Sequence, residues 1–315
     1  MFEDDIYGDA DSENTLIAGY RSIYTYNTII SQVLNSEGGT QREKEVLLGE
    51  ALVGRAFTYL ELISIYSRAY DKATASKALG MPLELEPEEN DFLRESVRPT
   101  LQENCDQIEK DLLDAVKLLN DKPTNTQYRA SKPAAYGLLA RLYLYMGNYS
   151  EALKYSELCL SHNSNLLNLN DYKVVDDGSF SYRIDVPYNG VDNKESVYLK
   201  YSQFEQGPSL YGVLYPSDEL IELYDQENDK RWQLYYTYNY ENIKTDRPVW
   251  APFLYLNIGV NTPEQYLIAA ECATRTGDTA KALKYINELR KYRLITFSAF
   301  ESADSEAILR EVLNE

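Results

Sequence analysis

A two-helix pattern that occurs twice in the chain restricts its fold more than any other feature. Between Ser131 and Leu160, Pro133 suits a first helical position and Gly147 can adopt the left-handed conformation that ends a helix. Asn148, with Glu151 three residues later, then predicts a capping box at the start of another helix. The stretch therefore predicts a helical hairpin.

The same pattern returns later in the chain and in register. Thr262-Pro263-Glu264-Gln265 predicts a helix start with a cap, a proline and a capping box, and Gly277-Asp278 predicts a turn into a second helix near Thr279. Small and large residues recur in the same order, as Ala140, Ala152, Leu153 and Tyr155 and again as Ala270, Ala282, Leu283 and Tyr285. This spacing is typical of tetratricopeptide units. We expect a mainly α fold in which tetratricopeptide-like hairpins form the scaffold.

Two amphipathic helices are predicted upstream of the first hairpin. Residues 45–66 carry apolar side chains at a period of 3.6 residues, and so do residues 101–119. Thr100 with Glu103 supplies a capping box for the second of these helices.

The segment between the hairpins has a different character. Solenoid repeats normally follow one another directly, so residues 163–260 are interpreted as an irregular insertion. Turn residues separate short tyrosine-rich pieces such as 196–201 and 234–240, so the insertion is predicted to consist of loops and a few short strands. Ser217 predicts the cap of one helix over 217–224. Long irregular insertions on a rigid scaffold are where ligands usually bind.

This pattern divides the chain into three parts of one integrated domain. Residues 1–162 form an N-terminal helical part with the first hairpin at 131–160. Residues 163–260 form the insertion, and residues 261–315 form the second hairpin and the start of a C-terminal helix.

Charge and composition limit the possible ligands. The 50 acidic and 31 basic side chains give a net charge of −19, which disfavours nucleic acid and anionic lipid surfaces. The chain has no apolar run of about 18 residues that could span a bilayer. Its 29 tyrosines offer flat apolar faces with polar tips, which suit half-wet surfaces that hold polar ligands.

Motifs for catalysis, metals and cofactors are absent from the sequence. The single histidine, His162, is predicted to end a helix, and no dinucleotide or phosphate-binding glycine motif occurs. Asp9-x-Asp11-x-Glu13 lacks the glycine and closing glutamate of a calcium loop, and the three cysteines show no metal-binding spacing, so each is expected to be a buried thiol. We therefore predict a binding protein that is not an enzyme and that has no metal or cofactor.

The order of segments resembles the SusD/RagB family of nutrient-binding outer-membrane lipoproteins. Residues 132–152, with Gly147-Asn148-Tyr149, carry the strongest similarity. The other matching segments are residues 49–66, Gly80-Met81-Pro82-Leu83, residues 97–119, residues 193–197, Pro216-Ser217 through Arg231, and residues 266–290. The resemblance covers residues 20–315. It also implies a leader, a lipid-bearing cysteine and a further C-terminal helix that this sequence does not contain, so we expect the chain to be truncated at both ends.

The resemblance implies a cell-surface lipoprotein of the outer membrane that captures oligo- or polysaccharide. Members of this family pass the glycan to a SusC-like TonB-dependent barrel transporter. They meet the barrel through the repeats and hold ligand with the insertion. For this chain we predict ligand contacts from aromatic and polar side chains of the insertion, namely Trp250, Trp232, Tyr238, Tyr240, Tyr211, Asn239 and Arg247.

Some alternatives stay open. Trp232 could instead pack in the core, since it follows Asp229-x-Arg231 in a segment that suits structural ion pairs. The chain could be a helical-repeat scaffold that binds a peptide or protein partner. It could also be a helical glycoside-processing enzyme, because paired carboxylates meet in space and leave no local motif.

Overall fold

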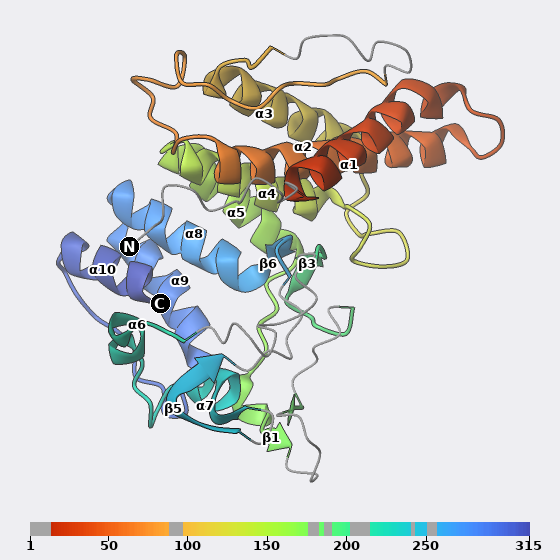
Figure 1. Cartoon of the computed structure of the whole chain (residues 1–315). Helices are drawn as coiled ribbons and strands as arrows, with labels where there is room; N and C mark the ends of the chain where they lie inside the picture. Colours follow the sequence, from red (N-terminus) through yellow and green to blue (C-terminus); the bar gives the residue numbers. More distant parts are fainter. Residues whose placement is uncertain are drawn as a thin grey trace. The chain divides into compact units, whose positions relative to one another are not determined.

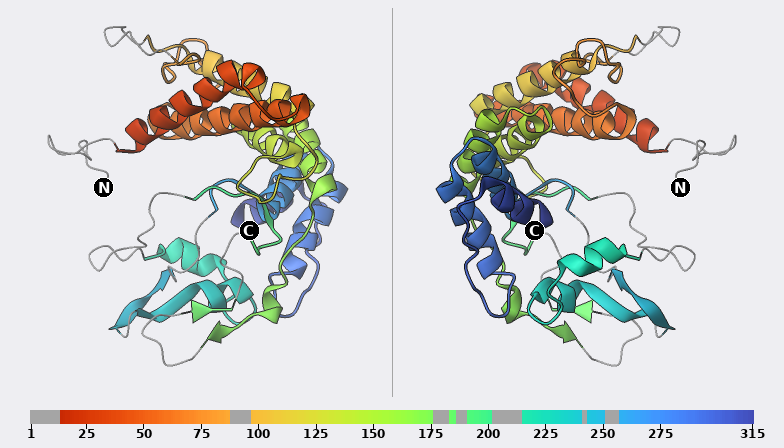
Figure 2. Two further views of the ribbon diagram at one scale, coloured as in Figure 1. Left: turned by 90° about the vertical axis from the view of Figure 1, so that its right-hand side faces the viewer. Right: turned by 90° about the vertical axis from the view of Figure 1, so that its left-hand side faces the viewer.

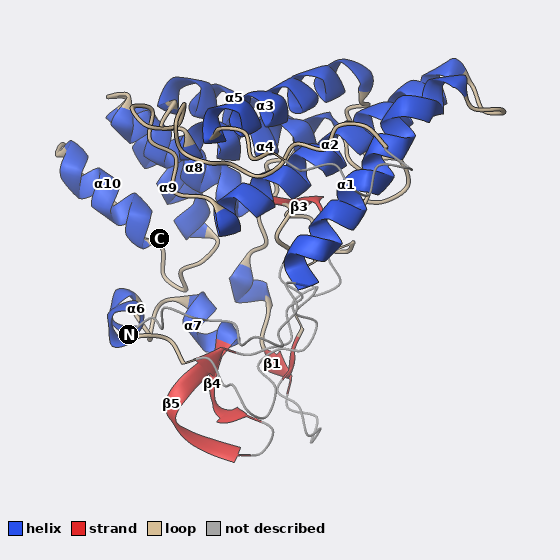
Figure 3. Cartoon of the chain, turned by 45° about the horizontal axis from the view of Figure 1, so that its top comes forward, coloured by secondary structure: helices blue, strands red, loops and turns tan. Residues whose placement is uncertain are grey.

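The computed structural model describes residues 14–87, 97–175, 183–185, 191–201, 215–240, 243–250 and 257–315. It is mainly helical, as predicted (Figure 1). The chain forms two compact units, Met1–Leu119 and Asn120–Glu315, and the single integrated domain remains a prediction. In the described part of the chain, the strands all belong to the second unit (Figure 3). No helix in that part combines the length and the apolar character needed to cross a bilayer.

The first unit is built on α2 (Gln41–Tyr66), which packs against α1 (Asn14–Gln32) on one side and α3 (Leu101–Leu118) on another. The predicted capping box of α3 is confirmed, since the Thr100 side chain accepts from the Glu103 amide and the Glu103 carboxylate accepts from the Thr100 amide. A short 3-10 turn, η1 (Val33–Asn35), follows α1. Helix α1 itself was not predicted.

A buried ion pair ties the three helices of the first unit together. The Arg55 guanidinium of α2 donates to both carboxylate oxygens of Asp111 in α3, each at 2.8 Å. It also donates to the Asn27 side-chain oxygen of α1 at 2.9 Å. Because all its polar atoms find partners, this group fixes the register of the helices without leaving an uncompensated charge.

The second unit contains both predicted hairpins. Helices α4 (Lys132–Tyr145) and α5 (Tyr149–His162) form the first, and α8 (Thr262–Arg275) and α9 (Thr279–Lys291) form the second, with α5 packed on α8. Gly147 and Gly277 have φ of +68° and +88° at the two turns, which are the left-handed conformations that the sequence predicts. Helix α10 (Ser305–Asn314) packs against α8 and α9.

The hairpin core consists of small and branched residues. Ala270, Ala273 and Ala282 are fully buried with Ile286 and Ile308, which lets α8, α9 and α10 approach closely. The predicted small positions Ala140 and Ala152 are also fully buried. Cys105, Cys159 and Cys272 are buried free thiols in the two units, as expected.

The predicted cap of α8 is wrong. Thr262 lies inside the first turn, and the residue at the cap position, Asn261, makes no capping hydrogen bond with its side chain. The Thr262 hydroxyl instead donates to the Asn165 carbonyl at 2.6 Å, and the Glu264 carboxylate pairs with Arg141. Contacts with the rest of the unit therefore replace the local capping box. At α5, the Asn148 side chain does accept from the Glu151 amide, at 3.5 Å, but no reciprocal bond is seen.

The insertion consists of short elements, as predicted. In its described residues, three two-stranded antiparallel sheets pair β1 (Val174–Val175) with β2 (Arg183–Ile184), β3 (Ser196–Tyr198) with β6 (Val260–Asn261), and β4 (Tyr236–Tyr240) with β5 (Ile243–Trp250). Ser217 caps the predicted helix, α6 (Asp218–Leu223), by accepting from the Leu220 amide. A 3-10 turn, η2 (Leu169–Asp171), and a further helix, α7 (Lys230–Tyr235), were not predicted.

Candidate ligand-binding site

A buried arginine fastens the insertion to the helical scaffold. The Arg293 guanidinium, just after α9, donates to the Glu195 carboxylate and to the Leu167 carbonyl, both at 2.7 Å. The Leu167 amide donates to the same Glu195 oxygen at 2.7 Å. Because these residues come from three distant parts of the sequence, the group fixes the start of the insertion, at Leu167, and an interior point, at Glu195, to the scaffold.

Main-chain bonds fix the start of α7 to the same place. The Lys230 amide donates to the Arg293 carbonyl at 2.9 Å, and the Ile295 amide donates to the Asn228 carbonyl at 2.7 Å. The Asn228 side chain adds a bond from the Thr296 amide at 2.7 Å. Helix α7 and the β4–β5 hairpin that follows it therefore have a rigid base.

An aromatic cluster fills the space between α6, α7 and β4. The rings of Trp232 and Tyr236 stack with centroids 4.8 Å apart, and Tyr224 lies 5.5 Å from each of them. Trp232 and Tyr236 are each only 8% exposed. Burial raises the pKa of Tyr236 above its ordinary value of 10.0, so its hydroxyl stays neutral at physiological pH.

The hairpin register places the second tryptophan position beside this cluster. Tyr236 pairs with Trp250 and Thr237 with Val249, and an irregularity follows before Asn239 pairs with Lys244. The backbone of Trp250 therefore lies directly across the ladder from Tyr236, a member of the cluster. At the irregularity, Tyr238 is 46% exposed.

The structure brings six of the seven predicted ligand residues onto α7, β4 and β5 (Figure 2). Trp232 is buried in the cluster, which agrees with the core alternative, and Tyr238 is exposed. Tyr211 lies outside the described residues. Trp250, Asn239 and Tyr240 have described strand positions but lack described side chains.

Arg247 is already engaged. Its guanidinium donates to the Asp218 carboxylate at 2.6 Å and to the Pro216 carbonyl at 3.1 Å. The Arg247 and Asp218 side chains are 45% and 77% exposed, so the pair contributes little to stability. Its geometric role is to join β5 to the first turn of α6.

Sequence reasoning missed Tyr224 and Tyr236 as members of the cluster. Tyr224 is the C-cap residue of α6 and Tyr236 is the first residue of β4. Neither therefore belongs to a periodic pattern that predicts whether its side chain points toward the core. The abundance of tyrosine in the insertion was the available signal, but it does not identify which rings meet.

The other residues considered for catalysis or metal binding are His162 and groups of carboxylates. His162 is the last residue of α5, as predicted, and its ring lies 6.0 Å from that of Tyr136. Among the residues that the structure describes, no group of three His, Cys, Asp or Glu side chains could hold a metal ion. The Asp9 to Glu13 segment lies outside those residues.

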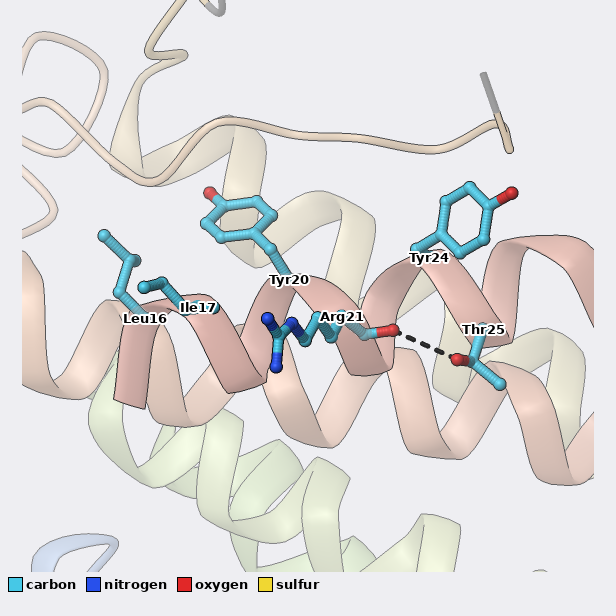
Figure 4. Close-up of a pocket in the computed structure, with 6 residues that line it drawn as sticks. All are labelled: Leu16, Ile17, Tyr20, Arg21, Tyr24 and Thr25. Carbon is cyan, nitrogen blue, oxygen red and sulfur yellow. Dashed lines mark hydrogen bonds between the residues drawn. The ribbon is translucent and has the colours of Figure 1, made fainter. Parts of the chain in front are cut away.

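A shallow pocket lies on α1 in the first unit (Figure 4). Leu16, Ile17, Tyr20, Arg21, Tyr24 and Thr25 line it. The Tyr20 hydroxyl donates to the Pro82 carbonyl at 2.9 Å, and the Thr25 hydroxyl donates to the Arg21 carbonyl at 3.0 Å.

Comparisons with known proteins point to one family. Residues 2–144 match a SusD-like family described as "Starch-binding associating with outer membrane". None of the curated proteins matches the chain. The sequence match therefore covers the first unit and the start of the second.

Solved structures extend the similarity to nearly the whole chain. A SusD-like carbohydrate binding protein from Bacteroides vulgatus is 20% identical with a TM-score of 0.74, over 95% of this chain and 65% of its own. A SusD superfamily protein from Bacteroides thetaiotaomicron is also 20% identical with a TM-score of 0.74, over 95% of this chain and 70% of its own. Another from the same species is 17% identical with a TM-score of 0.69, over 98% of this chain and 78% of its own. The chain thus has the fold of these proteins and spans about two thirds to three quarters of their length.

Proposed function

We propose that this SusD-like chain captures oligo- or polysaccharide at the cell surface, without catalysis, through the α7–β4–β5 hairpin of its insertion. The observation that carries the proposal is the aromatic cluster of Tyr224, Trp232 and Tyr236. Trp250 pairs with Tyr236 across the β4–β5 hairpin, and Tyr238, two residues after Tyr236, is exposed. Sugar rings carry apolar C–H faces that stack on flat aromatic rings, and polar side chains around them bind the hydroxyls.

The buried and the exposed rings take different roles in this proposal. Trp232 and Tyr236 are buried, so their proposed role is to support the β4–β5 hairpin and not to contact the glycan. Trp250, Tyr238 and Tyr240 are proposed to contact the glycan, with Asn239 as a hydrogen-bond partner, and Tyr211 from the insertion adds a further ring. Arg247 donates to Asp218 and Pro216 through Nη2, so it is proposed to bind ligand only through the other nitrogens of its guanidinium.

The test measures the melting temperature of the chain with and without soluble polysaccharides. A glycan that binds the folded state raises the melting temperature, and Trp250→Ala is expected to abolish that rise. Tyr145→Ala is a matched control, because Tyr145 is 52% exposed at the end of α4 and lies outside the insertion. If no polysaccharide shifts the melting temperature but peptides do, the glycan proposal is wrong and the peptide-binding alternative replaces it.

We also propose that the whole protein is a lipoprotein of the outer membrane that delivers glycan to a SusC-like TonB-dependent barrel transporter. The support is that the matching family is described as associating with the outer membrane. The full-length protein is expected to co-purify with a barrel transporter encoded beside its gene. A gene that encodes no leader with a lipoprotein cleavage cysteine would count against this part of the proposal.

A further inference from the structure

A second exposed aromatic surface lies in the second unit, away from the β4–β5 hairpin. It consists of Tyr128, in the loop before α4, and Tyr201, just after β3. The two rings meet edge to face, with centroids 5.8 Å apart and planes at 72°. Tyr128 is 44% exposed and Tyr201 is half-buried, so both rings are accessible at the surface.

The backbone beneath this pair is fixed. The Leu199 amide donates to the Gln127 carbonyl at 2.8 Å, which holds the Tyr128 loop against the β3 segment. Tyr201 forms an isolated antiparallel bridge with Asn257. The Asn257 side chain accepts from the amides of Lys200 and Gly259, each at 2.9 Å, and donates to the Tyr198 carbonyl at 3.0 Å. The rings therefore project from a preorganised support and not from a free loop.

The polar groups around the pair suit a neutral, hydroxyl-rich ligand. The phenol of Tyr128 is uncharged at physiological pH, and a hydrogen bond with Tyr201 raises its pKa further, from 10.0 to about 12. The Gln127 amide lies at the same loop and donates to the Val191 carbonyl at 3.3 Å, and the Lys200 ammonium lies 4.7 Å from the Tyr198 ring centroid. Two rings set at an angle, with their hydroxyl groups and the Gln127 amide on the same loop, combine an apolar face with hydrogen-bond partners, as sugar rings require.

We infer that Tyr128 and Tyr201 form a second glycan-binding surface, which contacts a distant part of the same polysaccharide that the β4–β5 hairpin holds. The loop before α4 and the hairpin lie at different ends of the second unit (Figures 1 and 2). A long glycan spans separate surfaces more readily than a short one, and its second contact then acts through effective concentration. This inference rests on the proposed function and adds to it a preference for long glycans over short ones.

The experiment compares a long and a short ligand on the whole chain. Soluble starch, xylan, mannan and mixed-linkage β-glucan are tested by affinity electrophoresis, and the polysaccharide that binds is then compared with its own tetrasaccharide by calorimetry. Tyr128→Ala is expected to weaken polysaccharide binding by about tenfold and tetrasaccharide binding by less than about twofold. Trp250→Ala is expected to weaken both. Tyr201→Phe keeps the ring and is expected to give a smaller loss than Tyr128→Ala.

The matched control is Tyr24→Ala on α1, because Tyr24 is 45% exposed and belongs to the first unit. Its affinity for both ligands is expected to equal that of the unchanged chain, and the melting temperatures of all variants without ligand are expected to agree within a few degrees. Polysaccharide affinity that Tyr128→Ala leaves unchanged, or an equal loss for both ligands, overturns the second surface and leaves the proposed function intact. A chain that binds none of the four polysaccharides overturns both.

Discussion

Arg141 of α4 and Glu264 of α8 join the two hairpins through a bidentate ion pair, although 123 residues separate them in the sequence. The Arg141 Nε lies 2.6 Å from one carboxylate oxygen and the Nη2 lies 2.8 Å from the other. The same guanidinium donates to the carbonyls of Ile258 and Gly259, just before β6. One side chain therefore holds the end of the insertion and the start of the second hairpin in place.

Removal of this arginine is expected to destabilise the second unit. Arg141→Ala leaves Glu264 and two carbonyls without their partner in a largely buried position, which costs about 3 kcal/mol. Arg141→Lys is expected to recover only part of the loss, because an ammonium cannot make the bidentate contact. Urea unfolding curves measure both. A double variant with Glu264→Gln should lose less than the sum of the single losses, and strict additivity would show that the pair is not coupled.

Truncation of Trp232 tests the support role of the aromatic cluster. Trp232→Ala removes a ring that is 8% exposed and stacks on Tyr236, and a loss of about 3–5 kcal/mol is expected. Tyr238→Ala removes a ring that is 46% exposed in the same hairpin, and a change within about 0.5 kcal/mol is expected. Chemical denaturation distinguishes the two. Equal effects would mean that the cluster does not support the hairpin.

Stability is expected to fall at alkaline pH. Burial raises the pKa of the Cys105 and Cys272 thiols from 9.0 to about 12, and that of the Tyr235 hydroxyl from 10.0 to about 12. The folded state holds these protons more tightly than the unfolded state. Their contribution is therefore complete below the unfolded values and is lost as the pH rises toward 12.

Urea midpoints from pH 7 to pH 11 check this expectation, with a constant midpoint up to about pH 9 and a decline above it. The substitutions Cys105→Ala and Cys272→Ala should make the decline shallower. A midpoint that rises above pH 9 contradicts the assignment of these buried neutral groups.

The thiols are also expected to resist modification. Cys105 is 2% exposed, and Cys159 and Cys272 are fully buried. Since the thiolate is the reactive species, both burial and the raised pKa of each thiol slow its reaction. A thiol reagent at neutral pH should label none of the three cysteines in the folded chain and all three in urea. Rapid labelling of the folded chain would place at least one thiol at the surface.

The helical scaffold could be predicted because its signals are local. The turns at Gly147 and Gly277 need a left-handed residue, and α3 begins with a capping box that lies within four consecutive residues. Long-range contacts override such signals at α8, where the Thr262 hydroxyl donates to the Asn165 carbonyl and the Glu264 carboxylate pairs with Arg141. Local pattern could not foresee those partners.

The candidate site could be predicted only as a region. Tyrosine-rich pieces marked the insertion, but the meeting of Trp232 with Tyr236 depends on a helix of six residues, which is too short to show a period. The position of Trp250 depends on the register of β4 and β5, and that register contains an irregularity. Helix α1 was missed because its serine, threonine and tyrosine residues blur the apolar stripe.

The central claim is that the chain binds a polysaccharide through its insertion and does not cleave it. The most direct test incubates the chain with the polysaccharide that retards its migration and follows new reducing ends over time. We predict retarded migration that Trp250→Ala abolishes, and no increase in reducing ends. Reducing ends that accumulate in proportion to the protein concentration, or migration that no polysaccharide retards, would contradict the claim.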